Sequence, residues 1–88
     1  MSNVKQNSID KENDLDVLDR VAYVPYHANG DLNHPDVEHG TISSMKYIRT
    51  SNPPYITYFV RFDKQVELLG WDWATSQGCK RDQLVKID

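Results

Sequence analysis

Cysteine is nearly absent from this chain, since Cys79 is the only one among 88 residues. A single cysteine excludes an internal disulfide, so the hydrophobic core alone must stabilise a domain of this size. That is typical of proteins that fold in a reducing compartment, and we expect a cytoplasmic location. A lone thiol is usually a small buried hydrophobe, and we predict that role for Cys79.

Long apolar segments and glycine-rich loops are also missing. The longest apolar runs are a few residues, whereas a transmembrane helix needs roughly 20, and residues 1–6 lack the apolar core of a signal peptide. The four glycines are scattered and form no phosphate-binding loop. We therefore expect neither export nor membrane insertion.

Charge is distributed unevenly along the chain. The net charge of −3 arises within residues 1–19, because residues 20–88 carry eight basic and eight acidic side chains. A neutral folded segment lacks the basic surface on which sequence-independent binding to phosphates depends. This lowers the expectation of a general nucleic-acid binder.

Residues 1–19 are polar and contain no aromatic side chain. This composition predicts a flexible acidic tail that is dispensable for folding through residue 18, followed by one folded domain over residues 20–88. The alternative is a short turn that begins at Asp14 as the N-cap, runs to Leu18 and docks on the domain.

The folded segment shows a series of short strand patterns. Residues 55–62 alternate between an apolar face and a mixed face, and the apolar side chains are Ile56, Tyr58, Val60 and Phe62. Arg61 lies on the mixed face, so its replacement should be nearly silent. Further strands are expected over 21–26, 40–48, 73–79 and 85–87, with a loop or one helical turn over 63–70.

The order of these elements predicts an all-β fold. A long first loop (27–39), a compact hairpin tip (49–54) and a tight turn (81–84) separate five short strands. This arrangement favours a small five-stranded SH3-like barrel with a short 3-10 turn before the last strand and a polar N-terminal tail.

Two sets of residues resemble known families. Residues 40–42, 58–63 and 82–85 resemble the strand signatures of SH3-like, Tudor-type and KOW-type domains. Residues 24–40, 62–65 and 74–79 are more closely similar to small uncharacterised proteins of tailed phages and prophages. The resemblance implies a phage origin, and hence the cytoplasm of the host cell, but it implies no activity.

The long first loop contains the candidate metal ligands. His27, His34 and His39 lie within it, and with Cys79 they would make an acceptable zinc set. Their spacing matches no known zinc pattern, so we expect no metal or other cofactor to be required. The alternative role is structural, in which Asp31 and Asp36 cap turns while His27 and His34 bond to the loop backbone.

Catalytic patterns are equally weak, and we expect no enzymatic activity. Cys79 has no recognisable base or orienting group.

Trp71 and Trp73 are two residues apart and would point the same way on an extended chain. We expect one to lie in the core and the other to be partly exposed. The sequence therefore favours a binding module for a host or phage protein. The predicted contact residues are Tyr26, His27, Asp31, His34, Asp36, Trp71 and Trp73.

Two alternative functions remain open. One is association with nucleic acid, as in some Tudor-like and KOW-like barrels. The other is sequestration of a small nucleotide, which His, Trp and Arg side chains would bind by stacking and hydrogen bonding.

Overall fold

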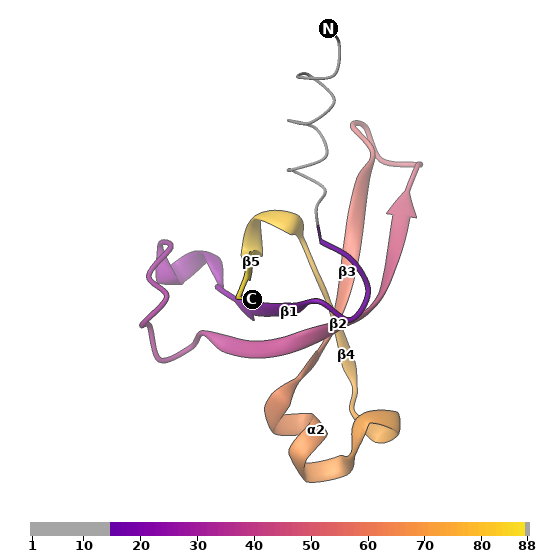
Figure 1. The fold of residues 1–88 in the computed structure, drawn as a ribbon. Coiled ribbons are helices and arrows are strands. Elements are labelled where there is room, and N and C mark those ends of the chain that lie inside the picture. The colour runs from indigo at the N-terminus through magenta and orange to yellow at the C-terminus, as the bar shows by residue number, and fades with distance from the viewer. Residues whose placement is uncertain (1–14, 88) are drawn as a thin grey trace, which may run out of the picture.

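The computed structural model describes residues 15–87 (Figure 1). Within this range the chain is mostly β, with five strands, one α-helix and three 3-10 turns. The strands are β1 (Arg20–Tyr23), β2 (Glu38–Ile48), β3 (Tyr55–Phe62), β4 (Ser76–Cys79) and β5 (Leu84–Lys86). The helix is α2 (Asp63–Leu69), and the turns are η1 (Tyr26–Ala28), η2 (Trp71–Trp73) and η3 (Arg81–Gln83). No helix in this range combines the length and apolarity needed to cross a lipid bilayer.

All five strands form one antiparallel sheet in the order β4-β3-β2-β1-β5. The five strands and the 3-10 turn before the last one confirm the prediction at that level. Within the described residues β4 and β5 remain the two edges of the sheet, so closure into a barrel is not observed.

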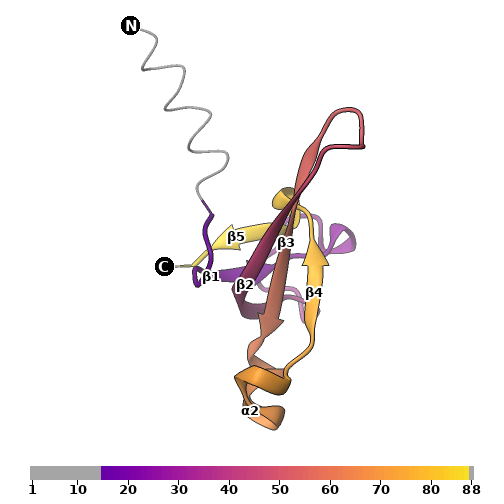
Figure 2. The ribbon, with the colours of Figure 1, turned by 90° about the vertical axis from the view of Figure 1, so that its right-hand side faces the viewer.

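The long strand β2 joins the two parts of the sheet. Its first residues pair with β1, nearly its whole length pairs with β3, and its register shifts between Ile42 and Ser44. A bulge of this kind bends a strand and increases its twist. Figures 1 and 2 show the result, in which β1 and β5 run crosswise to β3 and β4.

Close packing at Gly40 accompanies this bend. A Cβ atom added there would lie 2.6 Å from Val60 Cγ1 and 2.8 Å from the carbonyl oxygen of Arg61. Only a residue without a side chain fits so close to β3, which explains the glycine early in a central strand.

The hydrophobic core includes the inner face of β3. The alternation predicted for residues 55–62 is confirmed, because Tyr58, Val60 and Phe62 are buried and Ile56 is partly buried. Cys79 is buried among them as predicted. The remaining core members are Leu15, Val21, Ile42 and Leu84.

Residues 15–19 contact this core. Leu15 is 2% exposed and belongs to the core cluster. The Leu18 amide donates to the Ile42 carbonyl at 2.7 Å, and the Ile42 amide donates to the Asp19 carbonyl at 3.0 Å. This part of the assigned tail is therefore docked on the sheet, as in the alternative interpretation, while the rest of the tail and the proposed N-cap lie outside the described residues.

Helix α2 occupies the segment predicted as a loop or one helical turn. Seven residues are too few for a stable isolated helix, so contacts with the sheet must hold it. Arg20 donates two hydrogen bonds to Asp63 at 2.6 and 2.7 Å and a third to Thr41 at 3.1 Å. This fork ties the first turn of α2 to β1 and β2, a long-range contact that local sequence does not reveal.

The Arg20–Asp63 pair should make the free energy of unfolding depend on pH in the acidic range. The hydrogen bonds from Arg20 lower the pKa of Asp63 from its usual 3.8, so its contribution is complete above that value and disappears as the pH falls through the lower folded pKa. Both side chains are 37% exposed, and after allowance for solvent screening we expect Asp63→Asn to cost about 1 kcal/mol at neutral pH. Urea unfolding of both proteins should show this difference shrinking in acid. A difference that stays constant to the lowest pH would contradict the assignment.

Candidate functional site

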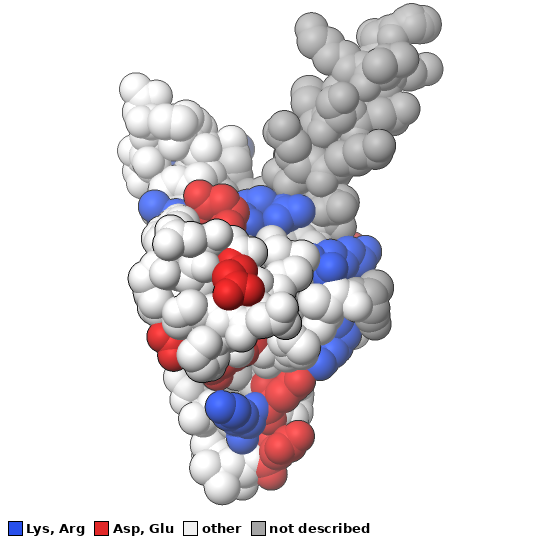
Figure 3. Space-filling view, turned by 90° about the vertical axis from the view of Figure 1, so that its left-hand side faces the viewer, with Lys and Arg blue, Asp and Glu red and all other residues white. Residues whose placement is uncertain are grey.

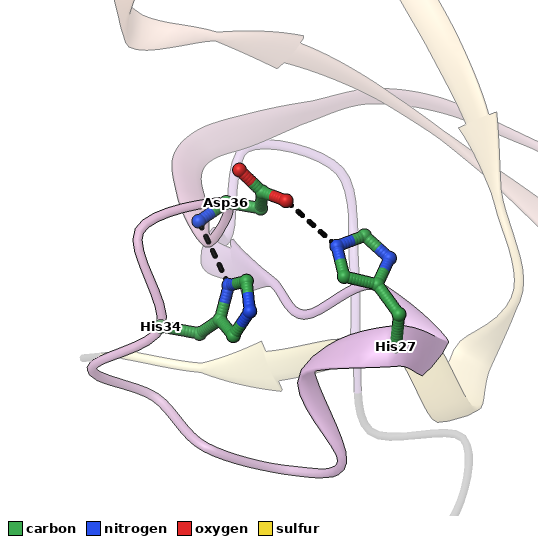
Figure 4. A group of neighbouring side chains, drawn as sticks. All are labelled: His27, His34 and Asp36. Carbon is green, nitrogen blue, oxygen red and sulfur yellow. Dashed lines mark hydrogen bonds and ion pairs between the residues drawn. The ribbon is translucent and has the colours of Figure 1, made fainter.

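The loop between β1 and β2 brings two histidines and an aspartate together (Figure 4). His27 Nε2 lies 2.7 Å from Asp36 Oδ2, and the Asp36 amide donates to His34 Nδ1 at 3.0 Å. The two imidazole rings meet edge to face with centroids 5.2 Å apart. His27 and Asp36 are exposed and His34 is half-buried. We call these three residues the loop cluster.

Turn-forming residues give this loop its order. Asn29 and Gly30 adopt left-handed backbone with φ of 52° and 79°, a conformation that these residue types tolerate best. Asp31 Oδ1 accepts from the Asn33 amide at 2.9 Å, and the His34 amide donates to the Asp31 carbonyl at 3.1 Å. The expected roles of Asp31 and His34 in the loop backbone are thus confirmed, whereas His27 and Asp36 bond to each other.

The four residues considered as a possible zinc set, His27, His34, His39 and Cys79, are not brought together. His39 lies on β2 and Cys79 is buried on β4, while Asp36 takes the third place beside His27 and His34. Burial raises the pKa of the Cys79 thiol to about 11, so at neutral pH very little thiolate is present to bind a metal or attack a substrate. The hydrogen bond from His27 lowers the pKa of Asp36.

Removal of metal should leave the fold intact. The core and the backbone hydrogen bonds of the loop do not involve a metal ligand set, so dialysis against EDTA should leave the circular dichroism spectrum and the melting temperature unchanged. Unfolding of the dialysed protein, reversed by zinc, would show that a metal is structural.

Both tryptophans lie on the surface, which corrects the expectation that one is in the core. Trp71 is 36% exposed and Trp73 is 80% exposed. They occupy the turn η2 and not an extended strand, so the alternation argument does not apply to them. The Arg61 guanidinium lies over the Trp71 ring at 4.8 Å from its centroid, and its Nη1 donates to the Trp71 carbonyl. Arg61 therefore positions η2, a role that its place on the mixed face of β3 does not predict.

Two leucines that sequence reasoning did not select lie next to these tryptophans. Leu68 is 76% exposed and Leu69 is 46% exposed at the end of α2, and α2 packs against η2. In the sequence, the only indication of this apolar surface was the pair of adjacent leucines just before Gly70. We call Leu68, Leu69, Trp71 and Trp73 the α2–η2 surface.

The structure separates the loop from the tryptophans. Figures 1 and 2 show the loop at the β1–β5 side of the sheet and α2 with η2 at the far end of β3. Tyr26 stays with the loop, and its hydroxyl donates to Asp82 of η3 at 2.8 Å, a bond that raises the Tyr26 pKa. The seven predicted contact residues thus form two surfaces: Tyr26, His27, Asp31, His34 and Asp36 on one, Trp71 and Trp73 on the other.

The loop side of the molecule carries few charges. Residues 24–37 contain Asp31 and Asp36 but no lysine or arginine. Figure 3 looks onto this side and shows an acidic group within a largely uncharged centre, with both acidic and basic groups toward the margin. Such a surface offers little attraction to phosphate groups.

The β2–β3 hairpin has the opposite character. Residues 39–62 contain no acidic side chain, and exposed tyrosines there lie beside cations. Arg49 lies 5.9 Å from the Tyr47 ring centroid, and Lys80 of the β4–η3 junction lies 5.7 Å from that of Tyr55. These residues form a small aromatic and basic arm.

Comparison of the chain with protein-family models, curated proteins and solved structures gives no match, and the chemistry of its surfaces is therefore the guide to its function.

Proposed function

We propose that this protein is a non-enzymatic binding module that recognises another protein through the α2–η2 surface. The observation that carries the proposal is the exposure of Trp73 and Leu68, at 80% and 76%, on two elements that pack against each other. Contiguous exposed apolar side chains often mark protein–protein contact sites. Tryptophan is also among the residues most enriched at binding hot spots.

The surface is held in place before any partner arrives. Arg61 fixes Trp71 through a hydrogen bond and ring contact, while the Arg20–Asp63 pair holds the first turn of α2. A prearranged surface loses less conformational entropy on binding. The contacts that hold Trp71 and α2 in place therefore favour binding at the α2–η2 surface.

We place the fold with SH3-like domains and the partner among host or phage proteins in the host cytoplasm. The strand order and the 3-10 turn between β4 and β5 support the first part. The resemblance of residues 24–40 to tailed-phage proteins supports the second. The raised pKa of buried Cys79 supports a function without nucleophilic catalysis.

Replacement of the most exposed tryptophan should weaken binding. The full chain is immobilised, and the proteins that it captures from cells expressing its gene are identified. Each captured protein is then purified, and its affinity for the chain is measured by calorimetric titration. Trp73→Ala and Leu68→Ala should each lose about tenfold or more in affinity, or roughly 1.4 kcal/mol. Because the contact is apolar, salt should change the affinity little.

Leu32→Ala is the matched control, since Leu32 is a 52% exposed leucine on the loop and should bind like the parent. The proposal fails if Trp73→Ala and Leu68→Ala bind like the parent while His34→Ala or Asp31→Ala loses affinity. It also fails if sedimentation shows a dimer of the chain that Trp73→Ala dissociates, because a second copy would then occupy the surface.

The aromatic and basic arm favours a second candidate function, which is contact with single-stranded nucleic acid. Bases stack on exposed aromatic rings, and adjacent cations pair with the backbone phosphates. Tyr47 with Arg49 and Tyr55 with Lys80 provide both groups. Fluorescence anisotropy with a labelled oligonucleotide should then show binding that weakens steeply with salt and is reduced by Tyr55→Ala. Salt-independent or absent binding would exclude this candidate.

A further inference from the structure

We propose that the loop cluster is a surface binding site for a divalent transition-metal ion such as zinc, with His27, His34 and Asp36 as the protein ligands. Each residue offers one ligand atom, and the three atoms lie within 4.8 Å of one another. This inference is independent of the proposed function, because the cluster lies apart from the α2–η2 surface (Figures 1 and 4).

The donor set selects the class of metal. Two imidazoles and one carboxylate suit zinc, nickel, cobalt and copper, whereas magnesium and calcium prefer sites made of oxygen ligands. Three protein ligands leave a fourth position open to water, as in zinc sites of the open type. Because His27 and Asp36 are exposed, solvent can reach the site.

The loop backbone holds the three side chains near one another without a metal. The Asn29 amide donates to the Tyr26 carbonyl at 3.0 Å, and the Val37 amide donates to the His34 carbonyl at 3.0 Å. These bonds fix the two turns that carry His27 and His34. Little backbone rearrangement is then needed when the metal arrives, which favours binding.

Hydrogen bonds within the cluster compete with the metal. The metal must replace the proton shared by His27 Nε2 and Asp36 Oδ2, and the Asp36 amide already occupies His34 Nδ1. Each displaced bond reduces the net gain from coordination. We therefore expect a dissociation constant in the range of roughly 1–100 μM, far weaker than that of a closed structural zinc site.

Calorimetric titration of the full chain, free of any histidine tag, with zinc chloride tests the site. The parent should bind one zinc ion, and magnesium should give no binding. His27→Ala and His34→Ala should each weaken zinc binding tenfold or more, and Asp36→Asn should weaken it by a smaller factor. His39→Ala is the matched control and should leave the affinity unchanged, since His39 lies on β2 outside the cluster.

A second measurement does not depend on the variants. Cobalt added to the parent should give the visible absorption of a nitrogen- and oxygen-bound ion, and the NMR signals of the His27 and His34 rings should shift on zinc addition while that of His39 stays in place. The proposal is overturned if zinc gives no binding at millimolar concentration. It is equally overturned if His39→Ala weakens binding as much as His27→Ala and His34→Ala do.

Discussion

Phe62→Ala is expected to lower the free energy of unfolding by about 3–5 kcal/mol. Phe62 is 7% exposed and belongs to the core cluster, and its ring meets that of Tyr23 edge to face at 5.8 Å. Removing the ring loses its transfer free energy and leaves a cavity that the bent sheet cannot readily fill. Because a small domain has only about 5–15 kcal/mol of stability in total, the variant should be partly unfolded at 37 °C. Urea unfolding followed by circular dichroism measures the change.

Arg61→Ala is the neighbouring control for this prediction. It removes a side chain from the other face of β3, and we expect a smaller loss of stability together with a change in tryptophan fluorescence, because Trp71 loses its Arg61 contacts. A greater loss of stability in Arg61→Ala than in Phe62→Ala would show that the two faces of β3 are assigned wrongly.

Leu15→Ala should also be strongly destabilising, by about 2–5 kcal/mol. Leu15 is 2% exposed and packs in the same cluster as Val21 and Ile42, although composition assigns it to a dispensable tail. Urea unfolding of Leu15→Ala and the parent provides the measurement.

Val17→Ala is the control for Leu15→Ala, because Val17 lies two residues away and is 45% exposed, and it should change stability by less than about 0.5 kcal/mol. If both substitutions are silent, residues 15–19 do not contribute to the core and the tail extends to residue 19 as composition suggests.

Periodicity and turn chemistry predicted the framework of this protein well. The alternation over residues 55–62 correctly predicted the bounds of β3 and its buried face. Alternate side chains of a strand point to opposite faces, so the apolar set identifies the face that packs on the core. Asn29 and Gly30 belong to residue types that favour turns, and both adopt the left-handed backbone in the loop.

Features that depend on long-range contacts could not be predicted in this way. Leu15 lies in a polar segment, and its burial depends on contacts with core residues such as Val21 and Ile42 that composition does not reveal. Helix α2 looks too short to form until Arg20, 43 positions before Asp63, anchors its first turn.

The candidate sites were predicted only in part. The sequence grouped His27, His34 and His39 as candidate ligands of one loop, but the grouping of His27 and His34 with Asp36 became evident only once the loop was folded. Trp71 and Trp73 were predicted as contact residues with one of them in the core, whereas both lie on the surface. Their separation from the loop follows from the sheet order, which places η2 at the far end of β3.

Fluorine NMR of the chain labelled with fluorotryptophan tests the proposed binding surface most directly. The free protein should give two tryptophan signals, which Trp71→Phe assigns, with Trp73 the more sensitive to exchange of H2O for D2O because it is 80% exposed. On saturation with the unlabelled partner protein, the Trp73 signal should shift and lose this solvent sensitivity as the side chain is buried. If binding is saturated and both tryptophan signals keep their positions and solvent sensitivity, the α2–η2 surface is not the contact site.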